Sequence, residues 1–399
     1  MSSPLLRNLE PSQAAGFERR ALDPGVLPRT AAIVDDVRRR GAQGLIDHAV
    51  ELGDLDEGAD WLHSPDALVA ALDSLPRADR GLLERVAARI RAFARAQRGC
   101  LRELDLAVPG GRAGHTLRPV ACAGCYAPGG RFPLPSSVLM TAVVAREAGV
   151  DRVWVASPRP ARVTLAACAV AGVEGLIAAG GAQAVAALAY GAGPVPACDV
   201  VVGPGNRWVT AAKHLVGDAA RIDMLAGPSE LLVLADASAD PVLVATDLLA
   251  QAEHDPQALP MLITTDRRLP ALVDIALHEQ LAGLPTGEVA RAALANGFCV
   301  LSSDLDSAVE LCNRIAPEHL SLVVRDPSGL APRLVNQGAL FIGTGTAEVF
   351  GDYGAGPNHV LPTGGTARHS GGLSVFSFLK ASTWLWIDDA SAARGMAED

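Results

Sequence analysis

Apolar positions divide the chain into a helical N-terminal part and a longer part built from short apolar runs. Residues 37–98 follow helical spacing, with one amphipathic run through Leu83, Val86, Ala87, Ile90 and Phe93. From about Leu117 the apolar runs become short and end at glycine or proline, which predicts strands. Residues 1–30 have few periodic apolar positions, so we expect an arm that lies on another surface.

The first set of short apolar runs alternates with helical patterns. Ser136 or Ser137 is expected to cap one of these helices, which continues through Val144. Strands are predicted at residues 119–126, 153–156, 176–179 and 200–202. Such a βαβ series implies a parallel sheet that binds ligands at the carboxyl ends of its strands.

A second α/β unit is expected to begin after Ser229. Its predicted strands are residues 231–235, 261–264, 298–301 and 339–343, and its predicted helices are one that ends near His254 and two at 269–281 and 289–295. We expect the N-terminal helices to pack against this second unit, which makes the first sheet an insertion.

The predicted fold is therefore α/β, with two Rossmann-like parallel-sheet domains, the second inserted into the first. The expected parts are an N-terminal arm (1–30), a discontinuous domain (31–125 and 229–373), an inserted domain (126–228) and a short C-terminal tail (374–399).

The composition is typical of a packed protein and argues against some classes of binding partner. The 399 residues are 49% hydrophobic and only 4% aromatic, which suits buried strands under alanine-rich helices. A net charge of -10 argues against nucleic-acid binding. No apolar run reaches the ~20 residues of a membrane span, so we expect no membrane association and a cytoplasmic protein. Cys122 and Cys125 form a lone C-x-x-C, interpreted as buried strand cysteines rather than a zinc or redox motif.

Three predicted strands end in turns of small residues. These turns are Ala127–Gly130, Gly180–Gln183 and Gly203–Asn206. Glycine lets a ligand approach the backbone, and a following helix N-terminus favours phosphate. None of them is a G-x-G-x-x-G, and each one alone could equally be a plain strand-to-helix turn.

Polar residues gather at three other turns. Gln251 and His254 share one face of a helix that Pro256 should end, Glu318-His319 follows Pro317, and residues 351–359 form a glycine-rich segment. Their residue types suit metal or acid–base sites. Structural alternatives are open for each: His254 as a cation at a helix C-terminus, Asp352 and His359 as turn residues, and Glu318-His319 as a cap or a solvated pair.

Over roughly residues 30–380 the chain closely resembles the histidinol dehydrogenase family. The resemblance rests on seven motifs in the family's order: Tyr126–Gly130, Gly180–Ala184, Gly203–Asn206, Ala226–Glu230, Gln251–His254, Pro317–His319, and Gly351–Tyr353 with Asn358–Thr363.

Members of this family are homodimeric zinc enzymes that oxidise L-histidinol to L-histidine with two NAD, through an aldehyde that stays bound. The resemblance implies that the inserted domain binds NAD through Tyr126, Gln183 and Asn206. It implies zinc ligands at Gln251, His254 and Asp352. It implies an acid–base pair at Glu318 and His319, and substrate contacts at Ser229, Gln251, His254, His319, Asp352 and His359.

The chemistry suits these residue types. Oxidising an alcohol needs a base for the hydroxyl proton while hydride leaves to nicotinamide, and a histidine with a pKa near neutrality can serve. We expect His319 to be that base, and Glu318 to activate the water that adds to the aldehyde. Zinc would hold and orient a substrate that has nitrogen donors.

The C-terminal region departs from the family pattern. Family members continue several dozen residues past the glycine-rich loop, and that tail supplies a glutamate and a fourth zinc ligand, a histidine, to the partner subunit. Here no histidine follows His369. We therefore expect a three-ligand site with weaker, less selective zinc binding, and His369 is a conceivable substitute ligand.

Three functions are consistent with this pattern. The first is NAD-dependent oxidation of a related amino alcohol, because the tail would have contacted the substrate. The second is oxidation of L-histidinol itself with a remodelled tail. The third is a catalytically silent paralogue that binds nucleotide or a partner, which retention of Glu318, His319 and the three NAD-side residues disfavours.

Overall fold

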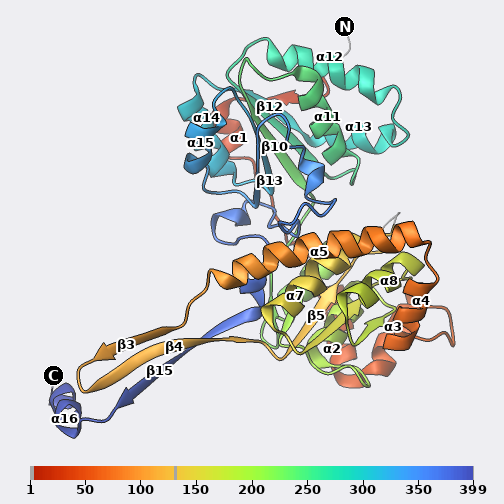
Figure 1. The fold of residues 1–399 in the computed structure, drawn as a ribbon. Helices are drawn as coiled ribbons and strands as arrows, with labels where there is room; N and C mark the ends of the chain where they lie inside the picture. The colour runs from red at the N-terminus through yellow and green to blue at the C-terminus, as the bar shows by residue number, and fades with distance from the viewer. Residues whose placement is uncertain (1–3, 130–132, 399) are drawn as a thin grey trace.

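The computed structural model describes residues 4–129 and 133–398, which form two parallel sheets and a long antiparallel arm (Figure 1). The two sheets belong to separate units, and the arm extends from the unit that holds the first sheet (Figure 1). Sheets of buried parallel strands covered by helices define an α/β fold, so the predicted fold class is confirmed. Gly130, in the first predicted turn, lies outside the described residues.

The first sheet has six strands in the order β2-β7-β6-β5-β8-β9. All neighbouring pairs are parallel except the edge pair of β2 and β7. The strands are β2 (Leu62–His63), β5 (Cys122–Tyr126), β6 (Arg152–Ala156), β7 (Gly175–Ile177), β8 (Val200–Val202) and β9 (Arg221–Ile222). Cys122 and Cys125 are buried in β5, as predicted.

Helices cover both faces of this sheet. The predicted helix after β5 begins at Pro135, whose ring fixes the backbone angle of the first helical position. Ser136 and Ser137 therefore lie inside the helix, and neither is its cap. The helices between these strands are α6 (Pro135–Val138), a π-helical segment (Leu139–Val143), α7 (Val144–Ala148), α8 (Arg162–Ala171), α9 (Gly181–Tyr190) and α10 (Arg207–Leu215).

The N-terminal helices pack against the first sheet, not against the second as expected. Buried Leu45, Leu68 and Leu83 join the core that contains β5 and β8. Helical periodicity specifies a buried face but not the surface that covers it, which explains the difference. These helices are α2 (Leu27–Arg40), α3 (Ala42–Glu51), α4 (Pro65–Asp73) and α5 (Arg77–Gly99).

The second sheet also has six strands, all parallel, in the order β1-β12-β11-β10-β13-β14. Its edge strand β1 (Arg7–Asn8) and helix α1 (Pro11–Ala15) come from the predicted N-terminal arm, which therefore lies on this chain's own sheet. The other strands are β10 (Glu230–Ala235), β11 (Leu259–Thr264), β12 (Phe298–Leu301), β13 (His319–Val323) and β14 (Ala339–Ile342). Its helices include α11 (Pro241–Ala252), α12 (Leu269–Leu281), α13 (Gly287–Asn296), α14 (Leu305–Ile315) and α15 (Pro327–Leu330).

The long antiparallel arm, called the arm from here on, is a three-stranded sheet that joins an early hairpin to the C-terminal strand. Strands β3 (Leu104–Val108) and β4 (Gly111–Pro119) pair antiparallel, and β15 (Leu379–Ile387) pairs along the whole of β4. Helix α16 (Ala390–Glu398) lies at the tip of the arm (Figure 1). Among the described residues, no helix is both long and apolar enough to cross a membrane.

Candidate active site

The two predicted acid–base residues lie at the amino-terminal edge of the second sheet. His319 is the first residue of β13 and pairs in register with Leu231 of β10, so both Glu318 and His319 lie beside Glu230. All three are buried. The structure places Glu318-His319 at a strand entry and not at a helix start, which removes the cap as an alternative.

His319 is held in one tautomer by its neighbour. Its Nδ1 lies 2.8 Å from the carbonyl oxygen of Glu230. A carbonyl only accepts, so Nδ1 carries the hydrogen and Nε2 is unprotonated. Burial, helped by the nearby His359, lowers the pKa of His319 to about 3, not near neutrality as expected. The imidazole is therefore neutral, with a free lone pair on Nε2.

Glu318 is fully enclosed and faces other carboxyl groups. Its Oε2 accepts a hydrogen bond from the backbone N–H of Glu230 at 2.8 Å. Burial raises the pKa of Glu318 well above its usual range, and the charges of Glu230, Glu348 and Asp352 raise it further. These surroundings therefore favour the protonated form of the carboxyl group.

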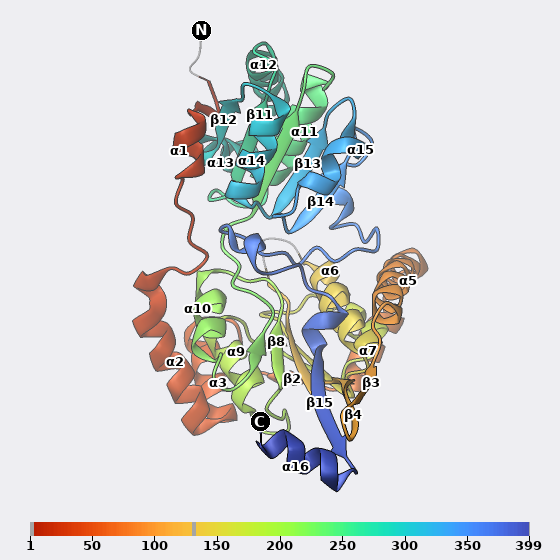
Figure 2. The ribbon, with the colours of Figure 1, turned by 90° about the vertical axis from the view of Figure 1, so that its left-hand side faces the viewer.

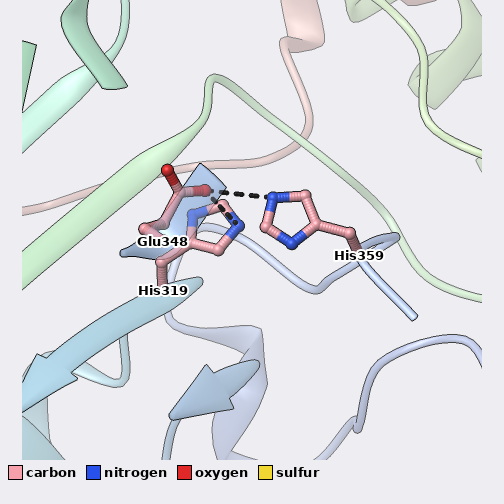
Figure 3. Close-up of side chains that lie close together, drawn as sticks. All are labelled: His319, Glu348 and His359. Atoms are coloured by element: carbon pink, nitrogen blue, oxygen red, sulfur yellow. Dashed lines mark ion pairs between the residues drawn. The ribbon is translucent and has the colours of Figure 1, made fainter. Parts of the chain in front are cut away.

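A third carboxylate, Glu348, joins two histidines and was not predicted. Its Oε1 lies 3.0 Å from His359 Nε2 and 3.5 Å from His319 Nε2 (Figure 3). The two imidazole rings stack with centroids 4.5 Å apart. Burial opposes an ionic pair, but the hydrogen bond between the two groups and the neighbouring charges together outweigh it, so the pKa of His359 is raised and that of Glu348 is lowered. The only signal in the sequence was the position of Glu348 four residues before Asp352.

Asp352 connects this buried group to the end of α11. Its Oδ1 lies 3.9 Å from His359 Nε2, and its Oδ2 lies 3.8 Å from His254 Nε2. Gln251, one turn earlier on α11, is buried, and its Oε1 accepts no hydrogen bond from the described residues. Two of the predicted zinc ligands, His254 and Asp352, therefore lie close together, and Gln251 precedes His254 by one helical turn. His369 is exposed.

The glycine-rich segment brings the site against the first unit. Asn358 Nδ2 donates to the carbonyl of Met140 at 2.7 Å, and Arg89 of α5 donates to the carbonyl of Gly354 at 2.7 Å. Ser229, half-buried, directly precedes Glu230. The segment that carries His359 therefore lies against the first unit.

The predicted NAD-side residues lie at the carboxyl ends of strands in the first sheet. The backbone N–H of Gly181 donates to the hydroxyl of buried Tyr126 at 3.2 Å. Burial raises the pKa of Tyr126 to about 12. Gln183 Nε2 donates to Asp54 Oδ2 at 2.9 Å, while its buried Oε1 has no partner among the described residues. Asn206 caps α10 through its side-chain oxygen.

A cavity of about 510 Å³ opens beside these strand ends. It is lined by residues from the turns that follow β5 and β6 and by the segment after α3, which contributes Asp54; among the other lining residues are Pro128, Gly129, Ser157 and Pro158. The volume lies in the ~300–1,000 Å³ range of small-molecule and cofactor pockets. Asp54, on the wall of this cavity, accepts a hydrogen bond from Gln183 Nε2 and so links the cavity to one of the predicted NAD-side residues.

The second unit carries a group suited to bind a cation. Donor atoms of His319, Glu348 and His359 all lie within 4.8 Å of one another. His319 Nε2, Glu348 Oε2 and Gln251 Oε1 are buried without hydrogen-bond partners among the described residues. Because an unsatisfied buried polar atom costs about 1–3 kcal/mol, these orphaned acceptors fit a site that receives a metal ion or a substrate donor.

A cofactor-sized cavity at strand ends and a neutral histidine beside buried carboxyl groups are features that suit a nucleotide-dependent dehydrogenase. The profile of the histidinol dehydrogenase family matches residues 18–398. Histidinol dehydrogenase from Thermus thermophilus is 46% identical over 390 residues, covering 96% of this chain and 92% of the relative. That from Bordetella parapertussis is 42% identical over 391 residues, covering 96% and 88%.

The fold comparison agrees with the sequence comparison. The crystal structure of histidinol dehydrogenase from Elizabethkingia anophelis superposes with a TM-score of 0.91 at 28% identity, covering 100% of this chain and 94% of that chain. The chain belongs to the histidinol dehydrogenase family. The predicted family and the predicted class, an NAD-dependent oxidoreductase, are confirmed, and the silent paralogue is not favoured.

Proposed function

We propose that this chain oxidises L-histidinol to L-histidine with two molecules of NAD, in the cytoplasm. The observation that carries the proposal is the meeting of Glu318, His319, His359 and Asp352 with the end of α11 at one junction between the units. These residues come from separate segments, and each one alone had a plausible structural explanation.

In the first oxidation His319 Nε2 takes the proton of the substrate hydroxyl while hydride leaves carbon for the nicotinamide. The carbonyl of Glu230 keeps the Nδ1 hydrogen in place, so the lone pair points away from Glu230. Glu348, close to the same Nε2, stabilises the imidazolium that forms. The carboxylate raises the pKa of His319 and so counters part of the effect of burial.

In the second oxidation water adds to the aldehyde, and the hydrate loses hydride to a second NAD and a proton to the protein. Glu318, whose pKa burial raises, is the group that exchanges protons with this water. Its conjugate base is stronger than that of an exposed glutamate.

We assign zinc to Gln251, His254 and Asp352, with His319, Glu348 and His359 as the acid–base group. A zinc ion there would hold and orient the nitrogen donors of the substrate. His254 and Asp352 are 44% and 34% exposed in their side chains, which leaves room for substrate, whereas Glu348 is already paired with His359.

The metal content of two variants distinguishes this assignment from a metal held by His319, Glu348 and His359. Asp352→Asn should lower bound zinc at least tenfold by inductively coupled plasma mass spectrometry, because a neutral amide replaces an anionic ligand. Glu348→Gln, the matched control, should retain zinc but turn over more slowly. Loss of zinc from Glu348→Gln with retention by Asp352→Asn would transfer the metal to His319, Glu348 and His359.

We propose a homodimer in which the arm contacts the second copy. The described part of the arm exposes apolar side chains that this chain leaves uncovered: Leu104, Leu106, Leu385, Trp386 and Met396. An exposed set of this kind indicates a protein interface. Trp386 is 66% exposed, and tryptophan is enriched among residues that dominate binding energy.

The double change Leu385→Asp with Trp386→Asp should convert the dimer to a monomer. Losing a central tryptophan costs about 2 kcal/mol or more, so the dissociation constant should rise at least about 30-fold. Sedimentation velocity measures it. Val242→Asp, at an exposed apolar position on α11, is the matched control and should stay dimeric. A double variant that sediments like the wild type would remove the arm from the interface.

A substrate panel tests the choice of alcohol. NADH formation should be at least 100-fold more efficient, as kcat/KM, with L-histidinol than with L-leucinol, because the site offers a cluster of imidazole and carboxylate groups to a substrate with nitrogen donors. A preference for L-leucinol would favour a different amino alcohol, and no reduction of NAD with any alcohol would reject the proposed function.

A further inference from the structure

We propose that Arg19 is a positioning residue that fixes Glu318 and His319 through Glu230; this inference rests on the proposed function. Arg19 lies on the segment that connects α1 of the second unit to α2 of the first unit (Figure 2). Its side chain is 11% exposed, and its Nη1 lies 2.5 Å from Glu230 Oε2. A solvated surface arginine would show neither feature.

Glu230 is the residue through which this charge reaches the site. Its backbone N–H donates to Glu318 Oε2 at 2.8 Å, and its backbone carbonyl lies 2.8 Å from His319 Nδ1. Both proposed acid–base side chains are therefore oriented by the main chain of one residue. The side chain of that residue is paired with Arg19.

The carboxylate of Glu230 also joins two loops. Glu230 Oε2 accepts from the backbone N–H of Glu318 at 3.4 Å, and Oε1 accepts from that of Gly364 at 3.0 Å. Gly364 follows the segment that carries His359. Because a buried carboxylate needs a partner charge to remain ionised, loss of Arg19 would weaken all of these contacts together.

Arg19 makes a second contact, at the turn that carries Glu318. Its Nη2 donates to the carbonyl of Ile315, the last residue of α14, whose carbonyl has no partner within the helix. The next residue, Ala316, has a left-handed backbone with φ of 52°, a conformation that is strained for a residue with a side chain. One guanidinium thus supports the strained turn and the start of β10 together.

Arg7 provides a matched control on the same N-terminal segment. It donates through Nη2 to the carbonyl of Asn296 at 2.6 Å and through Nε to that of Gly297 at 3.4 Å, so it anchors β1 to the far side of the sheet. It makes no contact with Glu230. Arg7→Ala therefore measures how much the anchoring of the N-terminal segment alone contributes to kcat.

The experiment compares wild type, Arg19→Ala, Arg19→Lys and Arg7→Ala as full-length protein with zinc. Arg19→Ala should lower kcat with L-histidinol by about 10–100-fold, because small displacements of catalytic groups cost that much, while KM for NAD and bound zinc stay unchanged. Arg19→Lys, which retains the charge but not the forked geometry, should be intermediate. Free guanidinium should restore part of the kcat of Arg19→Ala and none of Arg7→Ala.

A second readout is independent of turnover. Diethyl pyrocarbonate, followed by peptide mass spectrometry, should label His319 faster in Arg19→Ala than in wild type or Arg7→Ala. Unchanged labelling and kcat in Arg19→Ala, or equal changes in Arg7→Ala, would overturn the inference. If Arg19→Ala does not fold, the same comparison with Arg19→Lys decides it. If wild type does not oxidise L-histidinol, the proposed function fails, and labelling still decides the role of Arg19.

Discussion

Replacing His319 with asparagine should lower kcat for L-histidinol oxidation by about 10²–10⁴-fold, the contribution typical of general base catalysis. Asparagine can still donate a hydrogen bond to the carbonyl of Glu230, but it cannot take up a proton at the position of Nε2. The measurement is steady-state NADH formation at saturating NAD and L-histidinol. Fold and zinc content should be preserved.

His278→Asn, on helix α12 at the outside of the second unit, is the control for this change. It removes an imidazole outside the site and should keep kcat within about twofold, as expected for a surface substitution. A His319→Asn enzyme with a kcat within twofold of the wild type would mean that another group takes the hydroxyl proton.

Lys213→Met should destabilise the protein by about 3–5 kcal/mol, the cost of removing one partner from a buried ion pair. Lys213 is 1% exposed, pairs with Asp223 and donates to the carbonyl of Gly203 at 3.0 Å. Asp223 also accepts from the backbone N–H of Gly203 at 2.8 Å. The ion pair therefore also holds the turn before Asn206, so KM for NAD should rise as well.

Urea unfolding measures this change, and Lys380→Met is the matched control because Lys380, the chain's other lysine, is exposed on the arm. The double change Lys213→Met with Asp223→Leu should recover part of the loss, since it removes the uncompensated carboxylate. Equal stability of Lys213→Met and wild type would show that the ion pair does not stabilise the fold.

Strands and helices formed by continuous apolar runs were predicted well from the sequence. Residues 200–202 and 298–301 form β8 and β12 with the predicted bounds, and residues 269–281 form α12. Strand β13 was missed because Ser321 interrupts its apolar residues and Pro317 indicates a turn. The strands of the arm were missed because their apolar side chains are exposed and no buried face marks them.

The site was predictable where short motifs identify residues, and not where contacts join distant segments. Glu318 and His319 are neighbours in sequence, and Gln251 and His254 share a helix end. Glu348 and Arg19 belong to no such motif, and Arg19 meets Glu230 across 211 residues. Only the fold brings them together. The prediction of a near-neutral pKa for His319 was wrong for a related reason. Burial lowers this pKa, and burial depends on the distant segments that pack around the ring.

The yield of NADH from limiting L-histidinol tests the central claim most directly. With excess NAD and zinc-loaded enzyme, the claim of two successive oxidations at one site predicts two NADH and one L-histidine for each L-histidinol consumed. A yield of one NADH with accumulation of the aldehyde, or no NADH at all, would contradict it.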